Sequence, residues 1–521
     1  MSGGSGAAHK LARSGALNFV GLVYYGLANL ALVWVVSSQI GPGRAGEVLT
    51  TIAVFNIVQR AVLIGADIGL VRTISNWLAI GRRRDVERLW VPVGLPLLTC
   101  SLIATAVMWR WAEPLARLVG DRDAALTAQL RAVAPILPCA VAYQALEAAS
   151  RGFGTFVPSF VVEKVGKVTL QLGLVTTAAV LDARPRYVAL AWAAPFVLGS
   201  LVMLIWVRRL QHNPAEPPPD VATQQSRGVR VASREFWRFS AARAPAGLFQ
   251  SAQLWSDSVL VGALAAGGTI SAGIYAAGTR FLIVASFVQL AIGQALQPLV
   301  SAALARHDDR TSREVFQAAT GWTILFTWPV LIGIIGFAPA LLRIYGDEYD
   351  ATAASLVILG FAWMVATGCG PVDNVLLMSG RSILTTINSG IAVALNIGLS
   401  FLLIPDHGML GAAIAWGASL VFNNVTPLLQ VRHFLGLVPW GNAARRALVP
   451  VAAYAASIGA ARLVFGQSLV GATLGAILGL TVFAVLVGRD RAALEISTLA
   501  SGLRRRNGRT RMATVDSAQP M

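Results

Sequence analysis

Long apolar runs separated by short polar segments recur along the whole chain. Each run has about 20 residues or more, which is the length that an α-helix needs to cross the hydrocarbon core of a bilayer. The pattern therefore predicts an all-α membrane protein with about fourteen transmembrane helices. Their expected ranges are 15–39, 46–71, 89–111, 129–150, 156–181, 187–207, 236–264, 274–303, 318–342, 351–378, 382–403, 408–431, 444–463 and 468–488.

One polar stretch divides these runs into two sets. The segment from His212 to Ser233 is rich in Pro and polar residues, so it cannot bury a core and is expected to act as a flexible tether. The predicted parts are a cytoplasmic amino terminus (1–14), a first six-helix bundle (15–207), a cytoplasmic Pro-rich linker (208–235), a second six-helix bundle (236–433), a C-terminal helix pair (434–488) and a basic cytoplasmic tail (489–521).

The two sets of runs share a sequence pattern. Trp111 to Asp121 (WAEPLARLVGD) is echoed by Phe337 to Asp347 (FAPALLRIYGD), and at the same spacing Glu147 meets Asp373. An even number of spans separates the copies, so the repeats have the same orientation and are related by an axis along the membrane normal. Transporter folds built on this plan place the substrate between the halves. Chance similarity within apolar sequence is the alternative.

Composition supports the membrane assignment and defines a topology. The chain is 55% hydrophobic and only 13% charged, whereas soluble domains have about 25% charged residues. The net charge of +17 does not indicate nucleic-acid binding, because 31 of the 42 Lys and Arg residues fall in loops and helix ends on one side of the predicted layout and 9 on the other. The positive-inside rule makes the basic side cytoplasmic and places both termini there.

The sequence contains few motifs that are typical of catalytic or metal-binding sites. The three cysteines lie in apolar segments without a Cys or His partner, so they are interpreted as small core residues and not as metal ligands. The sequence has no P-loop, zinc signature or nucleophile elbow, and the predicted outer loops are too short for a membrane glycosyltransferase or polymerase. We therefore expect no catalytic residue, no metal and no cofactor.

Eight short motifs occur in order between residues 14 and 415. They are SGALNF (Ser14 to Phe19), QIGPGRAG (Gln39 to Gly46), DIGLVRTIS (Asp67 to Ser75), SDSVLVG (Ser256 to Gly262), AGIYAAGTRF (Ala272 to Phe281), YGDEY (Tyr345 to Tyr349), LNIGLSFLLIP (Leu395 to Pro405) and HGMLGAAIA (His407 to Ala415). In this order the chain resembles the polysaccharide and lipid-linked oligosaccharide flippases of the multidrug/oligosaccharidyl-lipid/polysaccharide exporter superfamily. The resemblance implies two bundles that form a V around a central cavity and work by alternating access.

Two arginines lie inside predicted spans, where an ionisable side chain is costly and usually faces a cavity or a partner. Arg60 and Asp67 are seven residues apart and fall within about 20° on one helix face. Arg60 is expected either to bind the pyrophosphate of a lipid-linked sugar or to hold Asp67 in place. Asp257 and Arg280 have matching predicted depths, which favours either an ion pair between them or a phosphate-binding role for an unpaired Arg280.

A third set of charges lies near the predicted cytoplasmic ends. Lys164, Lys167 and Arg243 are expected to line a vestibule that loads an anionic glycolipid, although basic side chains that snorkel to the interface are equally consistent with the pattern. The repeat-related acids Glu147 and Asp373 are candidates for gating or coupling, together with Asp67 and Asp257.

The resemblance implies that the chain flips a polyprenyl-pyrophosphate-linked oligosaccharide across a bacterial plasma membrane. The expected partners are the lipid-linked glycan, the bilayer and a glycan polymerase or glycosyltransferases, with no nucleic acid. A cation-coupled multidrug exporter of the same superfamily is the alternative; such a protein needs an acidic drug pocket and usually has twelve spans.

Overall fold

The computed structural model describes residues 3–79, 82–119, 124–212, 229–305 and 309–489, and these residues form helices without a strand. The α-helices are α1 (Gly3–Leu63), α2 (Ala66–Ala79), α3 (Arg83–Arg88), α4 (Trp90–Arg110), α5 (Ala112–Leu118), α6 (Ala125–Val133), α7 (Leu137–Gly152), α8 (Val168–Val180), α9 (Pro185–Ala193), α10 (Pro195–His212), α11 (Val229–Leu264), α12 (Gly268–Ala305), α13 (Asp309–Gly336), α14 (Ala338–Leu342), α15 (Ala353–Gly368), α16 (Val372–Met378), α17 (Ser382–Leu435), α18 (Asn442–Phe465) and α19 (Leu469–Arg489). Three short segments have other helical geometry: η1 (Ala134–Ile136), the π-helix η2 (Ser159–Lys167) and η3 (Asp347–Thr352).

Helices α1 and α17 are each long enough to cross a bilayer twice. They have 61 and 54 residues, or about 90 and 80 Å at 1.5 Å per residue, against a hydrocarbon core of about 30 Å. Each bends at a glycine with positive φ, Gly41 (φ 76°) in α1 and Gly408 (φ 55°) in α17. A side chain would be strained there, so glycine permits the turn. Gly41 lies between the predicted spans 15–39 and 46–71, and Gly408 is the first residue of the predicted span 408–431, so α17 contains two predicted spans and α1 contains one and most of the next.

Nine helices within the described ranges are long and apolar enough to cross a membrane, and α1 and α17 are two of them. The chain is therefore a multi-pass membrane protein, and the total of fourteen crossings stays a prediction. Both ends of the predicted linker at 208–235 are helical, because α10 continues to His212 and α11 begins at Val229. Its central part, 213–228, and the tail from 490 lie outside the described residues.

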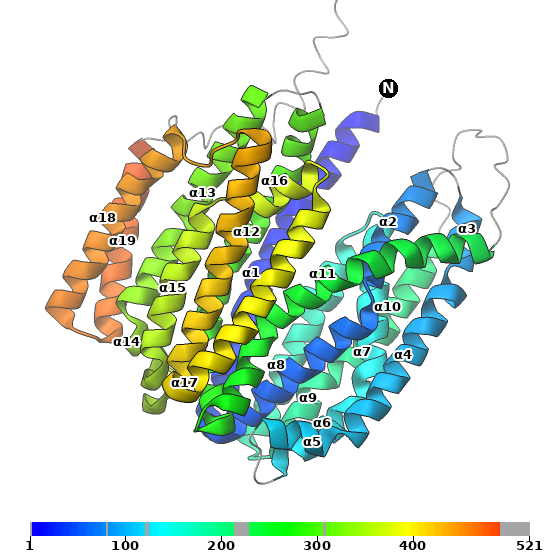
Figure 1. Ribbon diagram of the computed structural model, residues 1–521, viewed down its shortest axis with the longest axis horizontal. Helices are drawn as coiled ribbons and strands as arrows, with labels where there is room; N and C mark the ends of the chain where they lie inside the picture. Colours follow the sequence, from blue (N-terminus) through cyan, green and yellow to red (C-terminus); the bar gives the residue numbers. More distant parts are fainter. Residues whose placement is uncertain (1–2, 80–81, 120–123, 213–228, 306–308, 490–521) are drawn as a thin grey trace, which may run out of the picture.

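The helices form two bundles (Figure 1). Helices α4 to α10 pack around the second part of α1 and around α2, while α12 to α17 form the other bundle, and α18 and α19 lie outside α13. The repeated sequence has the same local form in both bundles, because α5 follows α4 as α14 follows α13: a short helix after a long one. The two sets of ribbons diverge towards the end of the molecule that carries the amino terminus.

At the opposite end the bundles are in direct contact. The indole Nε1 of Trp34 donates to the carbonyl of Ile344 at 3.0 Å, and the hydroxyl of Tyr349 donates to the carbonyl of Ser37 at 3.3 Å. Gly46 lies against the backbone of Thr269 and leaves no room for a Cβ atom. By the charge asymmetry of the sequence, this closed end is the predicted outer side.

Helix α11 crosses between the bundles (Figure 1). Its first part packs on α2, where Gly65 and Gly69 lie against Ser240, and the indole of Trp237 donates to the carbonyl of Pro92 at 2.9 Å. Its second part packs on α12 and α17. Both halves therefore bind to one continuous helix.

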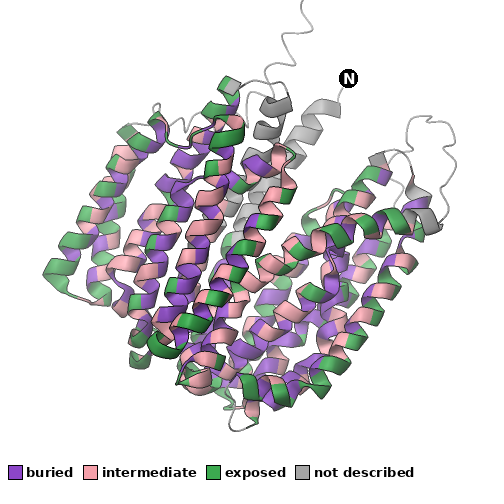
Figure 2. Ribbon diagram, in the orientation of Figure 1, coloured by how far each residue is buried: buried purple, intermediate pink, exposed green. Residues whose placement is uncertain are grey.

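The outward faces of α4 and α19 carry exposed residues (Figure 2), and many of these are large and apolar. They include Leu95, Leu98 and Leu102 on α4 and Ile477 and Leu478 on α19. In water such a surface would be unfavourable, whereas against lipid tails it has little cost. These faces are the lipid-facing surface of the protein.

Candidate functional site

A central cavity lies between the two bundles. It has two adjoining compartments of about 370 and 330 Å³, each within the range of about 300–1,000 Å³ that is usual for small-molecule sites. Both are lined from α1 and α7 on one side and from α11, α15 and α17 on the other. Six residues line both compartments, namely Asn56, Gln144, Leu254, Trp255, Trp363 and Trp416. The two compartments therefore form one continuous site.

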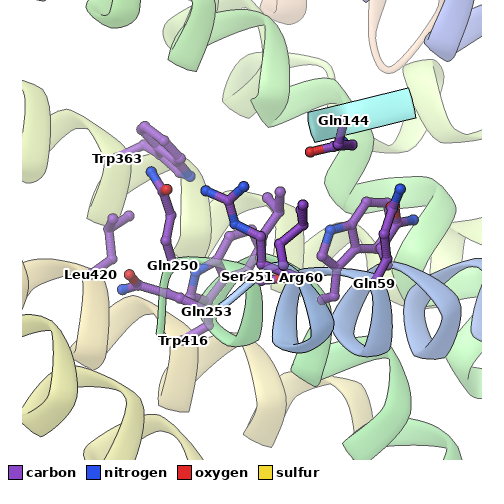
Figure 3. Close-up of a pocket in the computed structure, with 13 residues that line it drawn as sticks. Gln59, Arg60, Gln144, Gln250, Ser251, Gln253, Trp363, Trp416 and Leu420 are labelled. Carbon is purple, nitrogen blue, oxygen red and sulfur yellow. The ribbon is translucent and has the colours of Figure 1, made fainter. Parts of the chain in front are cut away.

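The larger one, here the amide compartment, is lined by glutamines and indoles (Figure 3). Three of its amides are fixed by the fold: Gln59 donates to the carbonyl of Ala140 at 2.8 Å, Asn56 to the carbonyl of Ile52 at 2.8 Å, and Gln253 to the hydroxyl of Ser419 at 3.4 Å. Gln144 and Gln250 have no hydrogen-bond partner among the described residues. Their amide groups are therefore free to bind a ligand.

The second one, here the charged compartment, contains Arg280, Lys167 and Glu163. The guanidinium of Arg280 lies over the ring of Trp255 at 4.5 Å, and Nζ of Lys167 lies 4.8 Å from the ring of Phe196. Within the described ranges neither cation has a carboxylate closer than 4 Å. A cation over an aromatic face is stabilised without being neutralised, so both charges remain available to an anion.

The π-helix η2 carries Glu163 and Lys167 into this compartment. A π-helix is a rare geometry that is frequently found at functional sites. Because a π-helix has more residues per turn than an α-helix, the side chains from Ser159 to Lys167 point in other directions than they would on an α-helix. The local backbone therefore sets where these two charges enter the cavity.

Arg60 lines the amide compartment, and it is paired. Its Nη1 lies 2.7 Å from Oδ2 of Asp67, and the two side chains are only 24% and 11% exposed. The pairing is the structural alternative foreseen for Arg60. The predicted common face of one helix is wrong, because the chain breaks at Ile64 and Gly65, so that Arg60 lies in the last turn of α1 and Asp67 in the first turn of α2. Because Asp67 neutralises it, Arg60 brings little net charge to the cavity.

The predicted ion pair between Asp257 and Arg280 is absent. Asp257 is buried inside the second bundle, where Oδ1 accepts a hydrogen bond from Asn396 at 2.7 Å. The ion pair was one of two alternatives for these residues, and it is wrong because equal depth does not fix the direction of a side chain: Arg280 faces the cavity, and Asp257 faces α17. The other alternative, an unpaired Arg280 that binds phosphate, stays a prediction. The carbonyl oxygen of Asn396 and the hydroxyl of Ser400, one turn later, are buried without a partner among the described residues.

The predicted vestibule of Lys164, Lys167 and Arg243 is also wrong as a single site. Lys167 lines the central cavity, and Lys164 lies beside Gly21 of α1. Arg243 lines a separate cavity of about 150 Å³ between α11, α16 and α17, together with Asp373. Lys164 and Lys167 share η2, whereas Arg243 lies on α11, and the tertiary packing places Lys167 and Arg243 in different cavities.

Glu147 is held within the first bundle. Its Oε2 pairs with Arg151 at 2.9 Å, and its Oε1 accepts from the hydroxyl of Ser159 at 2.6 Å. Ser159 is also 3.4 Å from Glu163, so a hydroxyl links Glu147 to a carboxylate that lines the cavity. Its repeat-related counterpart Asp373 is exposed at the mouth of the smaller cavity.

The indoles and glutamines were missed by sequence reasoning. Trp255, Trp363 and Trp416 read as ordinary apolar residues of membrane spans, and nothing in their spacing distinguishes them. A usable signal was Gln250, Ser251 and Gln253, three polar residues within one apolar span. No group of three or more His, Cys, Asp or Glu that could hold a metal occurs in the described part of the chain.

Comparison with known proteins relates this geometry to a family. Residues 245–402 match the MatE family. The fold is similar to that of the lipid II flippase MurJ in an inward closed conformation, with a TM-score of 0.70, 11% identity and coverage of 91% of this chain and 98% of that one. It is also similar to the inward-facing conformation of a multidrug resistance MATE family transporter of the MOP superfamily, with a TM-score of 0.63, 16% identity and coverage of 79% and 94%.

The chain thus has the fold of these transporters over most of its length, and its sequence matches the MatE family over residues 245–402. The resemblance found in the sequence motifs is thereby confirmed. A further relative, the probable low-salt glycan biosynthesis flippase Agl15 of Haloferax volcanii, is 23% identical over 208 residues. That match covers 38% of this chain and 42% of the relative, so less than half of each protein.

Proposed function

We propose that this protein flips a polyprenyl-pyrophosphate-linked oligosaccharide, or a related cell-surface polysaccharide precursor, across a bacterial plasma membrane. The relatives named as flippases support this proposal, since one is described as acting on lipid II and another as acting in glycan biosynthesis. The proposed partners are the lipid-linked glycan, the bilayer and the glycosyltransferases or polymerase that act before and after it.

The observation that carries the proposal is the pair of unneutralised cations, Arg280 and Lys167, in a cavity between the bundles. A pyrophosphate carries more than one negative charge, and a desolvated anion needs charge-assisted hydrogen bonds to offset its lost hydration. Arg280 lies on α12 of the second bundle and Lys167 on η2 of the first. One pyrophosphate bound by both would therefore connect the two halves.

The contacts between the bundles support alternating access. The halves touch at the predicted outer end through Trp34 and Tyr349, and they diverge at the other end. Substrate would enter from the cytoplasmic leaflet and leave after these contacts have separated. Asp257, Glu147 and Asp373 are proposed as coupling or gating groups, with Asp257 and its unsatisfied neighbours on α17 as the candidate cation or proton site.

A cation-coupled multidrug exporter is the second candidate, favoured by the MatE match over residues 245–402. A cationic drug would need a carboxylate in the cavity, and Glu163 supplies one. The charged compartment contains two cations and only one carboxylate, so it would repel a cationic drug everywhere except beside Glu163. For this reason we favour the flippase over the exporter.

The test is reconstitution of the purified protein into vesicles that contain a fluorescent prenyl pyrophosphate glycan. Wild type should move the glycan between leaflets, Arg280→Ala should abolish movement, and Arg280→Lys should restore part of it, because charge survives and the bidentate geometry does not. Arg184→Ala is the matched control, since Arg184 is exposed at the start of α9. Export of a cationic dye by wild type without glycan movement would establish the exporter instead.

A further inference from the structure

The amide compartment differs from the charged one in a way that bears on which sugar is carried. None of its thirteen lining residues is Asp or Glu, and the one charged residue, Arg60, is paired with Asp67. The remaining polar groups are amides and a hydroxyl: Asn56, Gln59, Gln144, Gln250, Ser251 and Gln253. The wall is thus polar and uncharged.

A primary amide offers both an acceptor oxygen and a donor nitrogen, whereas a carboxylate only accepts and a guanidinium only donates. A sugar hydroxyl also does both. The amides of Gln144 and Gln250 have no partner among the described residues, and Figure 3 shows both side chains extending into the cavity. These two free amides, which line one space with three further amides, therefore match a ligand with several hydroxyls.

The indole side chains of the compartment can also contact a sugar, through an N–H group and through the ring faces. Nε1 of Trp363 is buried and has no hydrogen-bond acceptor among the described residues. A buried hydrogen-bond donor without an acceptor is energetically costly. This indicates that a ligand atom or a water molecule accepts a hydrogen bond from this N–H in the functioning protein. The faces of Trp255, Trp363 and Trp416 carry the negative end of the ring quadrupole, which attracts the weakly positive C–H groups on one face of a pyranose.

We propose that the amide compartment is a subsite for an uncharged sugar ring next to the pyrophosphate, and that it disfavours a sugar bearing a carboxylate. This inference rests on the proposed flippase function. The two compartments share six lining residues, so a pyrophosphate held by Arg280 and Lys167 places its first sugars at Trp255, Trp363 and Trp416. A uronic acid there would be desolvated without a free cation to pair with.

The experiment measures binding to the purified full-length protein in detergent with three probes. These are a short-chain prenyl pyrophosphate without sugar, the same lipid with an N-acetylhexosamine, and the same lipid with a hexuronic acid. Binding is followed by the thermal stability of the protein. The neutral sugar should tighten binding by about ten-fold over the bare lipid, from one stacked ring and one or two neutral hydrogen bonds. The uronic acid should add nothing or weaken binding.

Variants locate the effect. Trp363→Leu and Gln250→Leu should each remove roughly three- to ten-fold of the gain from the neutral sugar, and the loss of affinity should be larger for the lipid with the neutral sugar than for the bare lipid. Trp363→Phe keeps the ring, loses the N–H and should have a smaller effect, which covers the case in which Trp363→Leu does not fold. Trp109→Leu, on the lipid face of α4, is the matched control. Arg280→Ala should weaken all three probes alike.

The outcomes separate the two proposals. If the bare pyrophosphate binds and the neutral sugar adds no affinity, or if the uronic acid adds as much, the subsite is refuted and the flippase proposal stands. Equal loss for all three probes in Trp363→Leu and Gln250→Leu also overturns the subsite. If no probe binds to wild type, the flippase proposal itself fails.

Discussion

The ion pair between Arg60 and Asp67 provides the sharpest test of how the cavity wall is built. Arg60 is in the last turn of α1, and Asp67 is in the first turn of α2. Between them the chain turns at Ile64 and Gly65, both with positive φ. A cation at a helix C-terminus and an anion at a helix N-terminus are each favoured by the helix dipole. The ion pair therefore links the two helix ends across the turn, and removing one partner should lower the stability of the protein.

The expected magnitude follows from burial. Breaking a fully buried pair by removing one partner costs about 3–5 kcal/mol, while an exposed pair contributes about 0–1 kcal/mol. Exposures of 24% and 11% place this pair between the two limits, so Arg60→Ala should cost about 2 kcal/mol after allowance for solvent screening. For a cooperative unit the size of one bundle this corresponds to a fall of roughly 4–8 °C in Tm.

The assay is a double-mutant cycle with Arg60→Ala, Asp67→Ala and both together, measured by thermal melting of the purified protein and by glycan movement in vesicles. The double variant should recover part of the stability lost by Arg60→Ala, because the buried carboxylate left unpaired has also been removed. Glycan movement should return with it. Losses that simply add would refute the coupling. A double variant as stable as wild type but without transport would show that Arg60 contacts the substrate directly.

Four further expectations concern topology, linker, coupling and closure. Reporter fusions at residue 220 and after residue 505 should both read cytoplasmic, as the 31-to-9 asymmetry of basic residues requires, and an external signal from either would refute the layout. Replacing 213–228 by a Gly/Ser chain of equal length should leave insertion and transport intact, whereas loss of insertion would make this segment a structural element. Asp257→Asn should fold normally, because Asn396 still has an acceptor, but should abolish the dependence of transport on a cation or proton gradient; an unchanged dependence excludes Asp257 as the coupling group. Gly46→Val should prevent close packing at the closed end. Cysteines introduced at positions 34 and 344 should therefore crosslink more slowly in this variant than in a protein that retains Gly46, and an unchanged crosslinking rate would contradict this expectation.

The sequence by itself determined the membrane class and the positions of many long apolar helices. These properties are local: the length of an apolar run, a glycine that permits a positive φ at 41 or 408, and basic residues at loop positions. They do not depend on which helix lies beside which. Counting along one helix favoured a link between Arg60 and Asp67, but their ion pair spans a break between α1 and α2 that the count did not predict.

The tertiary structure alone decided which distant side chains share a space. Depth along a helix can be counted from the sequence, but the azimuth of one helix relative to another is set by packing, so Asp257 faces Asn396 and Arg280 faces Trp255. The same reason separates Arg243 from Lys167, which local sequence had grouped. The indoles of the cavity were hidden because a tryptophan facing lipid and one facing a cavity look alike in an apolar run. Only the packing of α11, α15 and α17 against α1 and α7 gives Trp255, Trp363 and Trp416 a common space to line.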